Sequence, residues 1–153
     1  MLPYEQQLAR VERFLARIST PTTNRDDYED FLWAFFQNCW HLRDWIWYDS
    51  SIPQETRDAV SAEVEKSEVL LTCQCVANRS KHYELNRPPP RNARMLGGIS
   101  VRIKECSTNE DPDSATISLD YVLEREKGAS RHASTVAKAA VRKWKRILAR
   151  NGL

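Results

Sequence analysis

The first half of the chain repeats its hydrophobic residues every three or four positions, which is the spacing of one face of a helix. One such stripe predicts a helix over about residues 3–19. The stripe consists of Leu8, Val11, Leu15 and Ile18. Pro3 lies near the start of this segment and Pro21 follows its end, which are positions where proline starts or stops a helix.

The next predicted helix, over about residues 25–49, is the most hydrophobic segment, and Asn24 precedes it as a candidate N-cap. Its main apolar stripe is Phe31, Phe35, Cys39, Leu42 and Ile46. Its polar strip is Gln37, His41, Asp44 and Tyr48. Because the helix is apolar over so much of its circumference, we expect it to be the centre of a bundle or to pack on a second copy as well. Arg43 lies among the apolar side chains and needs a partner there.

Two further helical segments are predicted over about residues 53–66 and 68–82, and they either run on or kink near Ser67. The apolar face of the second segment is Val69, Leu70, Cys73, Val76 and Ala77. A separate polar stripe follows the same segment and consists of Gln74, Asn78, Lys81 and His82. Residues 87–94 contain three consecutive prolines, which remove backbone donors, so we interpret them as a linker.

The hydrophobic period changes beyond this linker. Alternating residues predict two strands, and these are Ile99, Val101 and Ile103, then Ile117, Leu119, Tyr121 and Leu123. A last helix is predicted over about residues 131–150. A two-stranded hairpin is marginal alone, so we expect it to lie against the bundle with the last helix over it.

These elements predict an α+β protein that is mainly α, with a four-helix bundle, a β-hairpin and a C-terminal amphipathic helix. We expect one domain over residues 1–153, because this length suits a single compact core. Within it, residues 1–86 form the core of the bundle, residues 87–94 the linker, and residues 95–153 the hairpin with the final helix.

Composition narrows the class of protein. Hydrophobic residues make up 41% of the chain and charged residues 29%, with a net charge of +2, which excludes a disordered or strongly polyelectrolyte chain. No run approaches the ~20 apolar residues that span a bilayer. The start of the chain lacks the apolar core of a secretory signal. We therefore expect a soluble, cytoplasmic protein with no membrane partner.

The sequence contains no nucleotide-binding or metalloprotease motif, and we expect no cofactor. The cysteines are Cys39, Cys73, Cys75 and Cys106. One residue separates Cys73 from Cys75, and no second Cys or His pair follows, which argues against a zinc site. We predict core or inert thiols and no metal ligands.

Two short blocks, "HLRDW" at residues 41–45 and "NRSKH" at residues 78–82, combine histidine with cations. Cleavage of a phosphodiester needs a proton donor or acceptor and positive charge near the phosphate, which these residue types supply. If the two helices pack antiparallel, His41 and His82 could share a cleft suited to metal-independent RNA cleavage. The alternative is that His82 caps a helix C-terminus and His41 is a half-buried histidine with satisfied hydrogen bonds.

The long apolar helices, "HLRDW" and "L..C.C.AN.SKHYEL" resemble small bacterial helical-bundle proteins of the HEPN type, over about residues 28–85. This resemblance implies a helical, often dimeric protein, frequently a metal-independent ribonuclease of toxin–antitoxin or antiviral systems. The signature of that family is an arginine, usually a polar residue after it, and a histidine four to six residues beyond. His82 matches the histidine, whereas Arg79 leaves only two residues before it, so the arginine is not matched.

In this reading His82 is the acid/base and Asn78 positions the substrate. Arg79 and Lys81 stabilise negative charge, and a second group completes the cleft. That group is His41, Arg43 and Asp44, in which Asp44 would orient His41.

The C-terminal segment from Arg131 to Leu153 contains seven Lys and Arg residues and no acid. The cations that lie opposite the apolar face are Lys138, Arg142, Lys145, Arg146 and Arg150. This face could follow the phosphates of a nucleic acid in a salt-dependent way. The alternative is an ordinary solvated face of an amphipathic helix.

The function that these patterns favour is RNA binding or metal-independent endoribonuclease activity of the toxin or defence type. The alternative is a noncatalytic protein-interaction or dimerisation module. An aromatic cluster, for which we expect core packing and a homodimer surface, consists of Trp33, Trp40, Trp45, Trp47 and Tyr48. The expected partners are RNA, a second copy of the chain, and an antitoxin or another protein.

Overall fold

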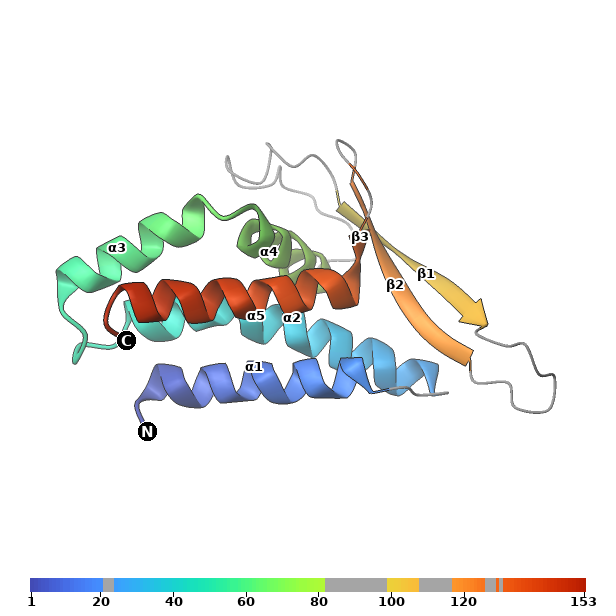
Figure 1. Cartoon of the computed structure of the whole chain (residues 1–153), viewed down its shortest axis with the longest axis horizontal. Helices are drawn as coiled ribbons and strands as arrows, with labels where there is room; N and C mark the ends of the chain where they lie inside the picture. Colours follow the sequence, from blue (N-terminus) through green and yellow to red (C-terminus); the bar gives the residue numbers. More distant parts are fainter. Residues whose placement is uncertain (21–23, 82–98, 108–116, 126–128, 130) are drawn as a thin grey trace.

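The computed structural model shows a mainly helical protein with a small antiparallel sheet at one end and both termini at the other (Figure 1). It describes residues 1–20, 24–81, 99–107, 117–125, 129 and 131–153. The helices within this part of the chain are α1 (Pro3–Ser19), α2 (Arg25–Trp47), α3 (Gln54–Glu65), α4 (Glu68–Lys81) and α5 (Ala133–Arg150). The strands are β1 (Ile99–Ser107), β2 (Ile117–Arg125) and β3 (Arg131–His132). The predicted linker at residues 87–94 lies outside the described residues.

Helix α2 is the central helix, as its pattern predicted, because it packs against α1, α3, α4 and α5. Its side chains at Phe35, Cys39 and Leu42 are completely buried. The start of the helix is fixed locally, since the Asn24 side chain accepts a hydrogen bond from the Asp27 backbone N–H at 3.1 Å. The helix ends two residues before the predicted boundary.

Helix α1 packs on α2 through its apolar stripe and through one buried polar side chain, Gln7. The Gln7 amide nitrogen donates to the Asn38 carbonyl at 2.9 Å and to the Asn38 side-chain oxygen at 3.1 Å. Its own oxygen accepts from Arg10 at 2.9 Å. These bonds satisfy a group that would be costly to bury alone, and they fix how α1 lies along α2.

Helices α3 and α4 are two separate helices, which resolves the alternatives at Ser67. The Ser67 hydroxyl accepts from the Leu70 N–H at 3.4 Å, and the Ser67 carbonyl accepts from the Leu71 N–H at 2.9 Å, so Ser67 caps α4. Helix α4 crosses α2 where the sulfur atoms of Cys39 and Cys73 lie 3.8 Å apart.

The sheet has three strands among the described residues, in the order β1-β2-β3, where the sequence predicted only a hairpin. Strands β1 and β2 pair antiparallel, with Val101 opposite Leu123. The last helix begins at Ala133, two residues after its approximate predicted start, because Arg131 and His132 are extended and pair with β2. A two-residue strand leaves no periodic pattern, which is why the sequence did not reveal it.

Helix α5 is part of the helical bundle and not a separate element packed outside it. It packs against all four other helices and contacts β2 and β3. Its buried residues join the same hydrophobic core as those of α1 to α4. The described core therefore contains five helices, one more than the predicted four-helix bundle. None of the helices in the described ranges has the length and apolar character needed to cross a membrane.

Candidate nucleic-acid interface

Helix α5 presents two contrasting faces. The buried face consists of Ala133, Val136, Ala137, Ala140, Val141, Trp144, Ile147 and Leu148. Trp144 is completely buried, and its indole N–H donates to the Cys39 carbonyl of α2 at 3.0 Å. This packing holds the helix in one rotational setting, so the direction of its opposite face is also fixed.

The opposite face carries exposed cations and no acid. All five residues that the sequence assigned to this face are exposed in the structure, and they are Lys138, Arg142, Lys145, Arg146 and Arg150. The structure divides them into two groups by what each side chain contacts, which the sequence of the helix alone does not show.

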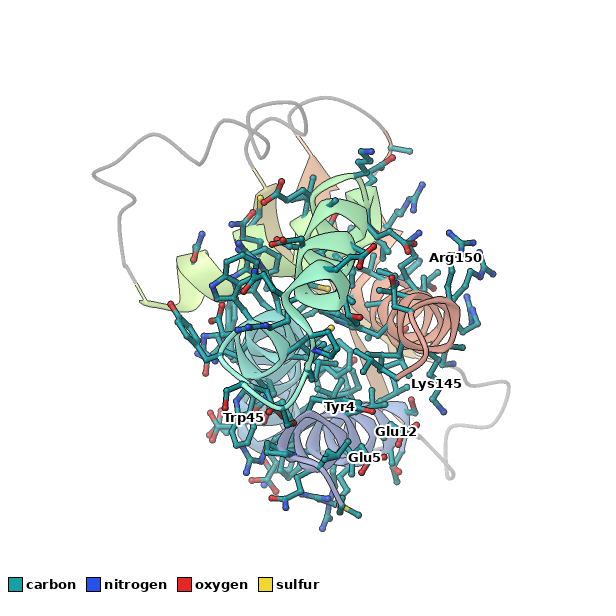
Figure 2. The ribbon with its side chains drawn as sticks, turned by 90° about the vertical axis from the view of Figure 1, so that its left-hand side faces the viewer. Tyr4, Glu5, Glu12, Trp45, Lys145 and Arg150 are labelled. Carbon is teal, nitrogen blue, oxygen red and sulfur yellow. The ribbon has the colours of Figure 1, made fainter. Side chains whose placement is uncertain are left out.

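The first group is neutralised by acids from neighbouring helices. The Lys145 ammonium lies 2.5 Å from the Glu12 carboxylate of α1, and the Arg150 guanidinium lies 3.0 Å from the Glu63 carboxylate of α3. Figure 2 shows Lys145 next to Glu12, with Arg150 farther along the same side. Exposed ion pairs of this kind contribute at most about 1 kcal/mol each to stability. Their main effect is to hold the Lys145 and Arg150 side chains against α1 and α3.

The second group, here called the α5 cation row, consists of Lys138, Arg142 and Arg146. Within the described ranges these side chains have no ion pair or hydrogen bond. Their spacing of four residues places successive Cα atoms about 6 Å apart along the helix axis. Like charges at this spacing destabilise a helix by about 0.2–0.5 kcal/mol per pair. The row therefore lowers stability slightly and is a suitable surface for a chain of phosphates.

The Arg43 side chain contacts an acid and an aromatic ring of the bundle. Its guanidinium lies 3.9 Å from the Glu65 carboxylate and 5.4 Å from the centroid of the Trp40 ring. Its Nε is shielded from solvent and has no hydrogen-bond partner in the part of the chain that the structure describes. The partner that the sequence required for this cation is thus Glu65, at the C-terminal end of α3, and the predicted role of Arg43 in RNA binding stays a prediction.

His41 and Asp44 lie on α2 and are both half-buried. No hydrogen bond or ion pair between their side chains occurs among the described contacts, although Asp44 was expected to orient His41. Asp44 instead lines a pocket at the C-terminal end of α2. His41 lies two residues from Cys39, close to the point where α4 crosses α2.

The remaining candidates lie at the end of α4. Asn78 is half-buried, Arg79 and Lys81 belong to the last turn, and His82 lies outside the described residues, as do the side chains of Arg79 and Lys81. Lys81 follows Cys73 by eight residues, which is about 12 Å along the helix axis from the crossing with α2. The shared cleft of His41 and His82 stays a prediction.

The cysteines at the crossing of α2 and α4 are part of the core. Cys39 and Cys73 are completely buried, and burial raises the pKa of the Cys73 thiol well above its usual value, with the neighbouring Cys39 thiol adding to the effect. The buried Cys73 thiol is therefore protonated and packs as a small apolar side chain. Among the described residues, no three His, Cys, Asp or Glu side chains gather in a way that could hold a metal ion.

No family model, curated protein or solved structure matches this chain. The fold and the site define its class directly: a mainly helical protein with a small antiparallel sheet and one helix that carries an exposed cationic face.

Proposed function

We propose that this protein binds RNA through the α5 cation row. The observation that carries the proposal is the difference between the two groups of cations on α5. Lys145 and Arg150 are neutralised by neighbouring acids, whereas Lys138, Arg142 and Arg146 are exposed in one line without acidic partners among the described residues. Releasing the counterions of a phosphate backbone favours binding to such a surface.

The chemistry of the row favours binding to the backbone rather than reading of bases. A line of cations on one helix contacts phosphates without distinguishing the sequence, and α5 carries no exposed aromatic side chain on which a base could stack. Because the whole protein has a net charge of only +2, the attraction comes from this face and not from the molecule as a whole. We expect weak, sequence-tolerant and strongly salt-dependent binding.

The direct test replaces the three cations of the α5 cation row with neutral side chains. The triple variant Lys138→Gln, Arg142→Gln and Arg146→Gln is compared with the natural chain by fluorescence anisotropy on a single-stranded RNA. Loss of three phosphate contacts lowers the slope of log K against log salt by about 2 in magnitude. Equal affinity and equal slope for the two proteins would overturn the proposal.

The finer part of the proposal is metal-independent cleavage by a HEPN-like site of the toxin or defence type. One imidazole takes the proton of the RNA 2′-hydroxyl, which attacks the adjacent phosphorus, and a second acid protonates the departing 5′-oxygen. His82 and His41 are proposed for these steps, with Arg79, Lys81 and Asn78 around the phosphate. The products are a 2′,3′-cyclic phosphate end and a 5′-hydroxyl end.

Cleavage is tested separately from binding. The natural chain and His82→Ala are incubated with mixed RNA in EDTA, and the new ends are analysed. We expect cyclic phosphate ends from the natural chain and none from the variant. Equal cleavage by both proteins would refute the role of His82, whereas binding without cleavage by either protein would leave RNA binding as the function.

A further inference from the structure

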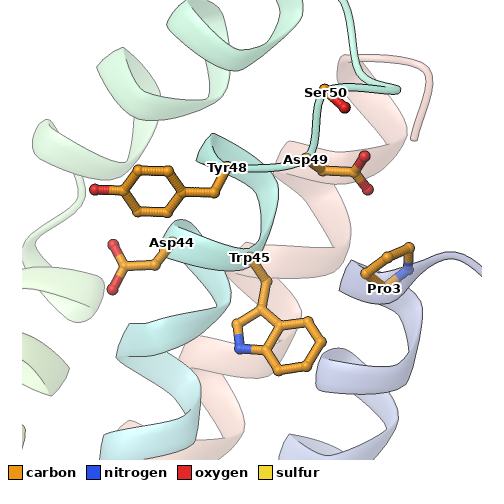
Figure 3. A pocket seen from close by; sticks show the side chains of 6 residues that line it. All are labelled: Pro3, Asp44, Trp45, Tyr48, Asp49 and Ser50. Atoms are coloured by element: carbon orange, nitrogen blue, oxygen red, sulfur yellow. The ribbon is translucent and has the colours of Figure 1, made fainter.

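A pocket of about 450 Å³ lies at the end of the bundle opposite the sheet, where the start of α1 meets the end of α2 (Figures 1 and 3). It is lined by Pro3, Asp44, Trp45, Tyr48, Asp49 and Ser50. Figure 2 shows Trp45 on the opposite side of the bundle from Lys145 and Arg150, so this pocket is distinct from the face that is proposed for RNA. We refer to it as the α2-end pocket.

The aromatic side chains of this pocket are unusually exposed for their size. Tyr48 is 80% exposed and Trp45 is 36% exposed, whereas Trp144 is completely buried. Asp44 and Tyr48 are one helical turn apart and project to the same side, with Trp45 next to them (Figure 3). An aromatic ring beside a carboxylate is the arrangement that recognises an organic cation.

The protein already places one guanidinium against this aromatic surface. The Arg10 side chain of α1 lies 5.7 Å from the centroid of the Trp45 ring. This distance lies within the range of a cation–π interaction. Tyr48 has no comparable contact with a cation among the described residues, and its ring is the more exposed of the two.

The charges at this end of α2 also favour a cation. The backbone carbonyls at a helix C-terminus form the negative end of the dipole, where cations stabilise and carboxylates destabilise. Helix α2 has no basic residue in its last turn, yet Asp44 lies there and Asp49 follows it. Arg57 of α3 donates to the Trp47 carbonyl at 2.9 Å, which satisfies one of these groups.

The two carboxylates differ in what surrounds them. The Asp49 Oδ1 accepts from the Ser51 hydroxyl at 2.6 Å and from the Ser51 N–H at 2.9 Å, while its Oδ2 is shielded and has no partner in the described part of the chain. Asp44 has no ion pair or hydrogen bond to its side chain within the described ranges. Arg10 and Arg57 also contact this end of α2, through the Trp45 ring and the Trp47 carbonyl, but the charged residues that line the pocket are Asp44 and Asp49.

We propose that the α2-end pocket binds a guanidinium or ammonium group on an alkyl chain. Asp44 is its counter-ion, and the rings of Tyr48 and Trp45 contact the cation and its chain. The cation is either a free small amine or guanidine, or an Arg or Lys side chain on a partner protein. This chemistry does not use the α5 cation row, which lies on another side of the bundle.

The experiment follows the indole N–H of Trp45 by NMR in the full chain, with its signal assigned from Trp45→Phe. Butylguanidinium is titrated against butylurea, a neutral compound of the same shape. We expect a saturable shift with the cation and none with the urea. A capped Ala-Arg-Ala peptide distinguishes the two sources, since tighter binding of the peptide indicates a protein partner and equal or weaker binding a small molecule.

Variants localise the effect. Asp44→Asn and Tyr48→Ala should each weaken binding by about fivefold. Asp58→Asn, an exposed acid on α3, is the matched control and should bind as the natural chain does. The proposal is overturned if butylurea shifts the signal equally, if no shift saturates, or if Asp44→Asn titrates like the control. RNA affinity of Tyr48→Ala stays unchanged in every case, so the two proposals fail independently.

Discussion

The contact between Trp144 and α2 determines how α5 is oriented, and replacing it is the most informative change to the core. The side chain is completely buried, and its indole N–H donates to the Cys39 carbonyl at 3.0 Å. Trp144→Phe keeps an aromatic ring in the core but removes this donor and the second ring. The variant therefore weakens the attachment of α5 without adding a polar group.

The expected loss of stability has two parts. The hydrogen bond contributes about 0.5–1.5 kcal/mol. Complete truncation of a buried Trp to Ala costs about 3–5 kcal/mol, and Phe retains more than half of the side chain, so the lost contacts and the cavity cost about 1–2 kcal/mol. The sum is about 1.5–3.5 kcal/mol, which lowers the Tm of a chain of this size by about 3–14 °C.

Urea and thermal unfolding followed by circular dichroism measure this loss, with Trp45→Phe as the control. Trp45 is 36% exposed, so its replacement should change stability by less than about 0.5 kcal/mol. The urea m-value should be unchanged in both variants. If Trp144→Phe is no less stable than Trp45→Phe, the assignment of Trp144 as the anchor of α5 is wrong.

Two further predictions concern polar and thiol groups. Cys39 and Cys73 are completely buried, and burial raises the pKa of the Cys73 thiol, so both should react with a thiol reagent only as fast as the protein unfolds. Peptide mapping after labelling should find the half-buried Cys75 modified before either of them; equal labelling of Cys73 and Cys75 in the folded protein would contradict this. The hydrogen bonds from Ser51 lower the pKa of Asp49, with a smaller contribution from Arg57, so the ionised form is favoured in the folded state. Its stabilising effect is present above the pKa of about 3.9 in the unfolded chain and is lost as pH falls through the lower folded value. Ser51→Ala should raise the Asp49 pKa in a carboxyl NMR titration, and an unchanged pKa would show that the hydroxyl is not responsible.

The helices of this protein are predictable because their signals are local. Asn24 is a cap that can be read from its position before the apolar stripe, and the N-cap bond that it makes depends on residues three positions apart. Arg43 stood out as a cation on an apolar face, and the structure supplies Glu65 as its partner. The strand β3 could not be found in this way, because two extended residues have no period.

The candidate sites depend on contacts between distant segments, which no local pattern contains. The cations of α5 look alike in sequence, and Glu12 and Glu63, from α1 and α3, distinguish those with an acidic partner from those without one among the described residues. The α2-end pocket arises because Pro3 and the end of α2 meet, and the polar strip that contains Asp44 and Tyr48 does not by itself predict this contact. The burial of Gln7 likewise depends on Asn38, 31 residues away.

The central claim is tested most directly by comparing two double variants of the same helix and the same net charge. Arg142→Gln with Arg146→Gln removes two members of the α5 cation row, whereas Lys145→Gln with Arg150→Gln removes the two cations that Glu12 and Glu63 neutralise. The salt dependence of RNA affinity is measured for both. We predict that the first pair lowers the magnitude of the slope of log K against log salt by about 1.4 and that the second pair changes it far less. Equal slopes for the two double variants, or a larger effect of the second pair, would contradict the assignment of the RNA site to the α5 cation row.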